Sequence, residues 1–352
     1  MFDARTDRRR VAVVTGGGGG IGAAIAEELG RAGHFVLTMD PLVSVDGAEQ
    51  LPGPDETTAD RIVAAGGSAR ASSVSVTDRD AVSGAFADLV DEHGGVDAVV
   101  NAGGISRPTT FTRGRDEDWS AVLAVHLDGY LNVLAAALPI MAAAGHGRIL
   151  GVTSGSGWRA ADTGAYGCAK RAVAALTWQL GRQAPPGVVV NALSPIAATR
   201  MVTAALRRAR QGHGTAAGSS GTGGLSLGLM PTPDQLGPLG VHLVAPELSW
   251  CRGQVIFGGG SEVAVIDEPR LLEVVRSDTG ASLAHVLEAV TPGALAPAEA
   301  GQASSGGSNP RFGPLFDEPP AGDLAPAAVS SCAVVTDRPS PPPPASPRYT
   351  PP

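Results

Sequence analysis

Residues 11–29 read VAVVTGGGGGIGAAIAEEL, and this stretch determines the fold class expected of the rest of the chain. Val11 to Val14 form a short apolar run typical of a buried strand, and Ala23 to Leu29 have the apolar spacing of a helix. The glycines between them can adopt positive φ and let the backbone approach a phosphate closely. A glycine run alone is more often a flexible loop. Strand, glycine turn and helix in this order predict a nucleotide-binding unit.

The start of the predicted helix is suited to a pyrophosphate, because its N–H groups are free and carry a partial positive charge. We therefore expect the cofactor to contact Gly16, Gly20, Ile21 and Gly22. A second predicted strand, residues 35–39, ends in Asp40, about 20 residues past the turn, where a carboxylate can accept from the adenosine ribose hydroxyls. Asp40 would repel a 2′-phosphate, and no Lys or Arg lies within the turn, so NAD is favoured over NADP. The alternative for Asp40 is a solvent-facing carboxylate at a strand end.

Strands and helices alternate along the next 230 or so residues. We expect strands at 69–76, 96–100, 148–152, 188–193 and 254–257, and helices at 58–65, after Asp78, at 116–144, after residue 164, at 203–210 and at 236–243. Alternation predicts a Rossmann-type, doubly wound parallel sheet in a three-layer α/β/α sandwich. Residues 41–58 are polar and predict an enlarged surface loop.

The predicted organisation is one domain with additions at both ends. Residues 1–10 form an N-terminal arm, residues 11–266 the nucleotide-binding domain, and residues 267–352 a C-terminal extension. The extension contains two apolar-periodic segments, around Leu271 and Leu283, and then becomes Pro-rich, which favours extended or disordered chain. Residues 212–224 are rich in Gly, Ser and Thr, and we expect them to be flexible.

Strand ends supply the further candidate cofactor-binding residues, because ligands of open α/β sheets bind at the carboxyl ends of the strands. Ser75 and Val76 are expected beside the adenine. Small residues after the fourth strand let a cofactor lie across its end: Asn101, Ala102 and Gly103. Ser154 follows the fifth strand and is therefore a candidate ligand-binding residue.

Lys170 is the only lysine in 352 residues, and it follows Tyr166 by four positions. Residues i and i+4 share one face of a helix, so the ammonium and the phenol can be neighbours. A nearby cation favours phenolate and should lower the tyrosine pKa, which makes Tyr166 a candidate proton-transfer group. The alternative is a half-buried Tyr beside a solvated Lys.

Composition excludes several classes of function. The net charge of −8 argues against nucleic acid. Three distant cysteines, Cys168, Cys251 and Cys332, give neither metal-ligand spacing nor a disulfide framework, so we expect no metal and a cytoplasmic location. No apolar run long enough for a signal peptide follows the basic N-terminus, so we expect none, and no apolar run looks long enough to span a membrane.

Together these motifs resemble the short-chain dehydrogenase/reductase family over residues 11–266. Thr15 to Gly22 resemble its Thr-Gly-x-x-x-Gly-Ile-Gly turn, residues 101–103 its Asn-Ala-Gly element, and Tyr166 with Lys170 its Tyr-x-x-x-Lys pair. The resemblance implies that Ser154, Tyr166 and Lys170 are catalytic. It also implies that Tyr166 and Lys170 contact the cofactor, as do Pro195 and Thr199, the last at the nicotinamide amide.

Within the family, residues 105–107 and 125–129 look like the (3R)-hydroxyacyl-CoA dehydrogenase units of multifunctional β-oxidation enzymes. Two positions depart from the family. His126 stands where many members have an Asn that holds a relay water, and Ile196 replaces a glycine after the proline. The extension beyond Asp267 is longer than the family domain requires.

The expected activity is NAD-dependent interconversion of a secondary alcohol and a ketone, such as a 3-hydroxyacyl-CoA or another lipophilic substrate. Trp158, Met201, Leu206 and Leu225 are candidate substrate walls. The alternatives are an NADPH-linked 3-ketoacyl reductase and a non-catalytic protein that senses NAD. The resemblance also implies a homo-oligomer, either a dimer or a tetramer.

Overall fold

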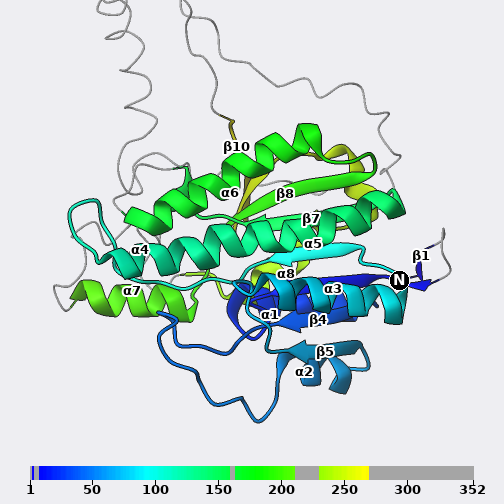
Figure 1. Ribbon diagram of the computed structural model, residues 1–352, viewed down its shortest axis with the longest axis horizontal. Helices are drawn as coiled ribbons and strands as arrows, with labels where there is room; N and C mark the ends of the chain where they lie inside the picture. The colour runs from blue at the N-terminus through cyan, green and yellow to red at the C-terminus, as the bar shows by residue number, and fades with distance from the viewer. Residues whose placement is uncertain (1, 4–7, 159–162, 211–229, 269–352) are drawn as a thin grey trace, which may run out of the picture. The chain divides into compact units, whose positions relative to one another are not determined.

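A mostly parallel sheet forms the centre of the domain (Figure 1). The computed structural model describes residues 2–3, 8–158, 163–210 and 230–268. Across the sheet the strand order is β10-β9-β8-β7-β6-β3-β4-β5. The seven parallel strands are β3 (Val11–Thr15), β4 (Phe35–Met39), β5 (Ser68–Ser72), β6 (Ala98–Asn101), β7 (Gly147–Val152), β8 (Val188–Pro195) and β9 (Val255–Gly259). The inner strands are apolar on both faces because helices cover both faces.

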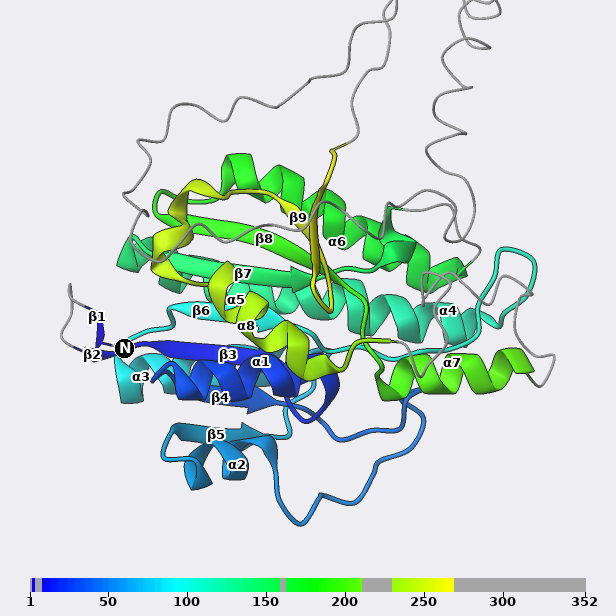
Figure 2. The same ribbon diagram turned by 180° about the vertical axis from the view of Figure 1, so that it is seen from behind.

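Helices pack on the two faces of this sheet, as Figures 1 and 2 show from opposite sides. One face carries α3 (Arg79–His93), α4 (Asp116–Leu123), α5 (Gly129–Ala144) and α6 (Gly164–Gln183). The other carries α1 (Gly20–Arg31), α2 (Thr58–Ala64) and α8 (Gly237–Leu243). Helix α7 (Arg200–Arg210) lies beyond the carboxyl ends of the strands. Short turns of helix complete the chain: η2 (Gly155–Gly157), η4 (Pro233–Leu236) and η5 (Pro246–Trp250). The expected three-layer Rossmann-type fold is confirmed.

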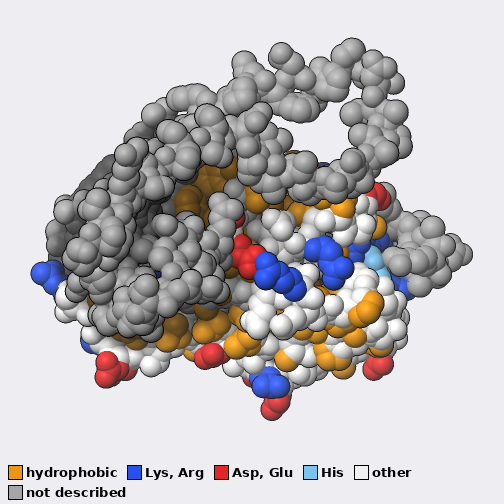
Figure 3. Space-filling model, turned by 90° about the horizontal axis from the view of Figure 1, so that it is seen from above, with side chains coloured by type: hydrophobic (Ala, Val, Ile, Leu, Met, Phe, Trp, Pro, Cys, Tyr) orange, Lys and Arg blue, Asp and Glu red, His pale blue; other side chains and the backbone are white. Residues whose placement is uncertain are grey.

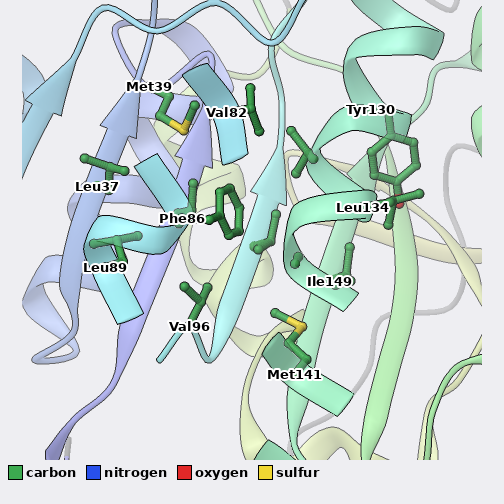
Figure 4. Packing of buried hydrophobic residues seen from close by; sticks show 14 of the residues in the cluster. Leu37, Met39, Val82, Phe86, Leu89, Val96, Tyr130, Leu134, Met141 and Ile149 are labelled. Atoms are coloured by element: carbon green, nitrogen blue, oxygen red, sulfur yellow. The ribbon is translucent and has the colours of Figure 1, made fainter. Parts of the chain in front are cut away.

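The larger core cluster lies between the sheet and the first group of helices. Figure 4 shows Phe86 and Leu89 of α3 facing Leu37 and Met39 of β4. Phe86 is 1% exposed. Full burial of such side chains contributes about 1.5–3 kcal/mol each, so this packing fixes the height of α3 above the sheet.

The strand order reverses between β3 and β6, and this reversal positions the site. Helices that follow β3 and β6 leave toward opposite faces, so a crevice opens where the two strands end. The Gly16 turn and the Asn101-Ala102-Gly103 segment therefore meet at one point, although 85 or so residues separate them in the chain.

One predicted strand limit is wrong, and one strand was missed. Strand β5 ends at Ser72, because it pairs with β4 only as far as Met39, so Ser75 and Val76 lie in the following turn. The fold also has an antiparallel edge strand that was not predicted, β10 (Glu262–Ile266), which turns back on β9. Val263 and Val265 of β10 are 66% and 65% exposed, so β10 lacks the buried apolar run that marks the central strands.

The predicted helix at 116–144 contains an irregular turn, the π-helical segment η1 (Ala124–Asp128), between α4 and α5. A π turn adds a residue and shifts the phase of the helix that follows it. Tyr130 and Val133 are consequently buried, whereas Leu131 is 42% exposed. The shift also places His126 in the π turn and buries it.

This same helical stretch, residues 116–144, is long and apolar enough to cross a membrane, so the prediction that no such segment exists is wrong by length and composition. In the fold it packs on the sheet between α3 and α6 (Figure 1). On the face drawn in Figure 3, separate basic and acidic side chains are scattered among apolar ones on the described part of the chain.

At the amino end, β1 (Phe2–Asp3) pairs with β2 (Arg8–Arg9), and Arg8 donates two hydrogen bonds to Asp97. The apolar segments around Leu271 and Leu283, the Gly-rich residues 212–224 and the Pro-rich end lie outside the described residues.

Candidate active site

The glycine turn between β3 and α1 forms an open cradle. Gly16 and Gly20 have φ of 65° and 55°, a conformation that favours glycine. A Cβ on Gly16 would lie 2.7 Å from the Gly103 nitrogen, so the two strand ends could not meet if Gly16 had a side chain. At Gly19 and Gly20 a Cβ would enter nearly open space above the N-terminus of α1, which no side chain caps. Free helical N–H groups beside open space fit a pyrophosphate.

Asp40 lies against this cradle, at the end of β4. Its Oδ2 accepts from the Gly18 N–H at 3.0 Å and its Oδ1 from the Leu42 N–H at 2.8 Å. A Cβ on Gly18 would lie 2.7 Å from Oδ2, so the carboxylate takes the place of a side chain at Gly18. Asp40 thus places a negative charge beside the glycine turn, as predicted.

Asn101 has a different place from the one predicted. It is 4% exposed, and its side-chain oxygen accepts from the Thr15 hydroxyl at 2.9 Å, while the same hydroxyl accepts from the Gly103 N–H at 3.2 Å. Asn101 therefore joins β3 to β6 beneath the cavity and does not line it. A strand-end Asn is directed inward here because the Thr15 hydroxyl, on the neighbouring strand, needs an acceptor.

Tyr166 and Lys170 occupy one face of α6, as their spacing predicts. The Lys170 ammonium lies 5.8 Å from the centre of the Tyr166 ring and donates to the Val152 carbonyl at 2.6 Å. Lys170 is 5% exposed. The Thr153 hydroxyl donates to the Lys170 carbonyl at 2.6 Å, which fixes α6 against the end of β7. The alternative of a solvated lysine is wrong.

The predicted direction of the Tyr166 pKa is wrong for the protein alone. Burial raises the pKa of Tyr166, and a hydrogen bond with Ser154 only partly opposes this. Burial also lowers the pKa of Lys170 from 10.5 to about 7, so the ammonium is half deprotonated at neutral pH. Removing both groups from water disfavours both charged forms, and this effect outweighs the attraction that sequence spacing suggested.

Ser154 connects the end of β7 to this pair. Its hydroxyl accepts from the Ser156 N–H at 3.3 Å and hydrogen-bonds to the Tyr166 phenol. The extended backbone at Ser154 starts the turn η2 and directs the side chain into the cavity. The three residues predicted to be catalytic therefore line one cavity.

His126 lies in the wall of the cavity, beside Tyr166. Its Nε2 lies 2.7 Å from the Ile105 carbonyl oxygen, and its ring meets Tyr166 edge-on at 5.1 Å. Burial, followed by the charge of Lys170, lowers the pKa of His126 to about 3, so the imidazole is neutral. A Cβ on Gly104 would lie 2.4 Å from His126 Cε1, so this ring requires a glycine there.

The cradle, Asp40, His126 and the three residues predicted to be catalytic line one cavity of about 860 Å³. Apart from Asn101, every residue predicted to bind cofactor lines it, including Ser75, Val76, Pro195 and Thr199. Met201 also lines it, as predicted for a substrate wall. Trp158 does not, because its indole N–H donates to the Ser194 hydroxyl at 2.9 Å. The Leu206 side chain and Leu225 lie outside the part of the chain that the structure describes.

The cavity has a second wall that sequence reasoning missed. The loop after β4 folds over the cleft, where the Ser106 N–H donates to the Val45 carbonyl and Arg107 donates to the Asp46 carbonyl, both at 2.7 Å. Val43, Val45, Gly47 and Gln50 consequently line the cavity. The available signal in the sequence was two valines, Val43 and Val45, and Gly47 within an otherwise polar loop.

Comparison with known proteins identifies the family. Residues 10–211 match the family model described as short chain dehydrogenase. The short-chain reductase protein NovJ of Streptomyces niveus is 34% identical over 252 residues, which is 71% of this chain and 92% of NovJ. The peroxisomal hydratase-dehydrogenase-epimerase of Neurospora crassa is 31% identical over 54% of this chain, and the match spans 21% of that longer protein.

Solved structures give the same result. A short chain dehydrogenase from Mycobacterium avium superposes with a TM-score of 0.65 at 29% identity and covers 82% of this chain and 94% of its own. A 3-oxoacyl (acyl-carrier-protein) reductase from Agrobacterium tumefaciens with NADP bound superposes with a TM-score of 0.58 at 27% identity, covering 71% and 93%.

Proposed function

The chain belongs to the short-chain dehydrogenase family, and from this premise we propose that it is an NAD-dependent oxidoreductase that interconverts a lipophilic secondary alcohol and its ketone. The observation that carries the proposal is the convergence of Ser154, Tyr166 and Lys170 in the cavity that also holds the glycine cradle. A cofactor site and an acid–base pair within one cavity are the two parts that such a reaction needs.

Each residue of the trio has a distinct role in this mechanism. The Ser154 hydroxyl donates to the substrate oxygen and stabilises the negative charge that develops on it. The Tyr166 phenol gives a proton to that oxygen during reduction and takes one during oxidation. Lys170 orients Tyr166 and holds the nicotinamide ribose. When bound, the nicotinamide supplies or accepts the hydride.

Protonation of Tyr166 sets the pH dependence of the two directions. Because burial raises the pKa of Tyr166, the phenol is protonated at neutral pH, which is the form that reduction requires. Oxidation requires the phenolate, so its rate should rise with pH. Reduction should slow as pH rises toward the pKa of Tyr166.

Asp40 supports NAD over NADP. A carboxylate beside the Gly18 N–H can accept from a ribose 2′-hydroxyl, and it would repel a 2′-phosphate. The Agrobacterium reductase holds NADP, so an NADPH-linked 3-ketoacyl reductase is the second candidate. Parallel rate measurements with NADH and NADPH decide between them, and a strong NADPH preference would overturn the NAD assignment.

The substrate side of the cavity favours an uncharged, lipophilic group. Ala121, Val125, Met201 and Val202 line it together with Pro108. Acyl thioesters and other secondary alcohols with an apolar chain match such walls. We propose a 3-hydroxyacyl thioester as the first compound to test, with simple secondary alcohols beside it, by following NADH absorbance.

Tyr166→Phe tests the catalytic assignment, and the chain offers a matched control. Tyr130 is a fully buried tyrosine on α5, and its hydroxyl has no hydrogen-bond partner among the described residues. Tyr166→Phe should lower kcat by at least about a hundredfold while NADH binding stays near normal, whereas Tyr130→Phe should retain turnover. Equal activity in the two variants would refute the role of Tyr166. Dinucleotide binding by the unmodified protein without turnover of any alcohol would instead favour an NAD-sensing protein.

A further inference from the structure

Arg200, the first residue of α7, reaches across to the glycine turn. One guanidinium nitrogen, Nη2, lies 3.9 Å from the position that a Cβ on Gly19 would occupy. Arg200 is exposed, and it makes no hydrogen bond or ion pair with any residue that the structure describes. The residue before it, Thr199, has its methyl carbon 3.6 Å from the corresponding Cβ position of Gly20. The start of α7 therefore faces the N-terminus of α1 across the cleft.

The other cations that line the cavity are already engaged. Arg107 donates to Asp118 at 3.2 Å and to the Asp46 carbonyl. Lys170 donates to the Val152 carbonyl beside Tyr166. Among the cavity-lining residues that the structure describes, Arg200 is thus the cation left for an anion at the glycine turn.

Building on the proposed function, we propose that Arg200 binds the pyrophosphate of the dinucleotide and pins α7 to it. The α1 N-terminus offers N–H groups from one side, and the guanidinium offers a planar fork of donors from the other. Charge-assisted hydrogen bonds between guanidinium and phosphate are short and directional. The missing side chain at Gly19 leaves the space that the Arg200 fork needs.

This contact has a consequence for the substrate side. The residues that follow Arg200 on α7 form part of the cavity wall, namely Met201, Val202 and Ala205. Anchoring Arg200 on the cofactor fixes the start of the helix that carries this wall. A bound dinucleotide thereby completes the surface against which the substrate lies.

The test is a binding titration of the full-length protein, with Arg200→Gln compared with Arg207→Gln. Arg207 is an exposed arginine of the same helix that does not line the cavity. NADH, NADPH and ADP-ribose are titrated by calorimetry at about 50 mM and about 500 mM salt, a range that shortens the screening length severalfold. Arg200→Gln should weaken all three ligands by about fivefold at low salt, and by less at high salt, because exposed ion pairs are screened. Arg200→Lys should retain part of the affinity, and Arg207→Gln all of it.

Two results would overturn the inference: equal affinities of Arg200→Gln and Arg207→Gln, and a loss confined to NADPH, which would assign Arg200 to the 2′-phosphate. A thermal melt checks that Arg200→Gln is folded. If it is not, the ligand affinities of Arg200→Lys and Arg207→Gln are compared instead, and equal affinities would likewise overturn the inference. Dinucleotide binding without turnover of any alcohol would refute the proposed function. The titrations would still test the role of Arg200, because they measure binding alone. Absence of dinucleotide binding by the unmodified protein would defeat both.

Discussion

The stability of the protein should depend on pH because the Lys170 amine is buried, and replacing Lys170 with methionine should remove this dependence. Burial lowers the pKa of Lys170 from 10.5 to about 7. Between these pH values the unfolded chain binds a proton at Lys170 that the folded chain has released. Stability therefore rises with pH in this window, and the destabilising contribution is fully present below the folded-state pKa.

The size of the effect follows from the two pKa values. One proton of difference changes the free energy of unfolding by about 1.4 kcal/mol per pH unit. At pH 7 the folded amine is half protonated, so integration from pH 7 to pH 9 gives about 2 kcal/mol. The raised pKa values of Tyr130 and Tyr166 act above pH 10, outside this interval.

Urea unfolding followed by tryptophan fluorescence at pH 7, 8 and 9 measures the effect by linear extrapolation. The free energy of unfolding of the unmodified protein, minus that of Lys170→Met, should increase by about 2 kcal/mol across the series. Because Lys170 is the only lysine, no other side chain of its type contributes to the slope. A difference that stays constant within about 0.5 kcal/mol would show that Lys170 keeps an ordinary pKa and would refute the desolvation argument.

Further predictions concern packing and charge. Gly104→Ala should destabilise the fold by about 1–3 kcal/mol, because the new methyl group meets the His126 ring. The double variant Gly104→Ala/His126→Ala should recover part of that loss. Urea unfolding of both variants measures the two free energies of unfolding. Phe86→Ala should cost about 3–5 kcal/mol by the same assay, against less than about 0.5 kcal/mol for Phe111→Ala, since Phe111 is 71% exposed. Asp97→Asn should cost about 1–3 kcal/mol, because the Asp97 carboxylate accepts from two Arg8 nitrogens and the Val11 N–H; a melting temperature unchanged from that of the unmodified protein would contradict this.

Short-range features of the site could be predicted from the sequence because their geometry is local. Tyr166 and Lys170 meet on α6 because four residues make about one helical turn. The glycine turn follows β3 directly, so its place at a strand end depends on neighbouring residues only. Asp40 ends β4 for the same reason.

Predictions failed where a residue's partner is distant in the chain. Asn101 was predicted to face the cofactor, but Thr15 on the neighbouring strand draws its side chain inward. Trp158 was predicted to line the substrate site, but Ser194 on β8 accepts its N–H. The loop after β4 was expected only as a surface feature, and its contacts with Ser106 and Arg107 make it a cavity wall.

The sequence by itself determined the alternation of strands and helices, the glycine turn and the trio of Ser154, Tyr166 and Lys170, since each depends on spacing along one segment. Only the tertiary structure decided the directions in which the pKa values of Tyr166 and Lys170 shift. Desolvation depends on which atoms pack around a group, and those atoms come from β7, α6 and the π turn at His126. The same holds for Arg200, whose approach to Gly19 joins residues about 180 positions apart and follows from the crevice that the reversal of strand order opens.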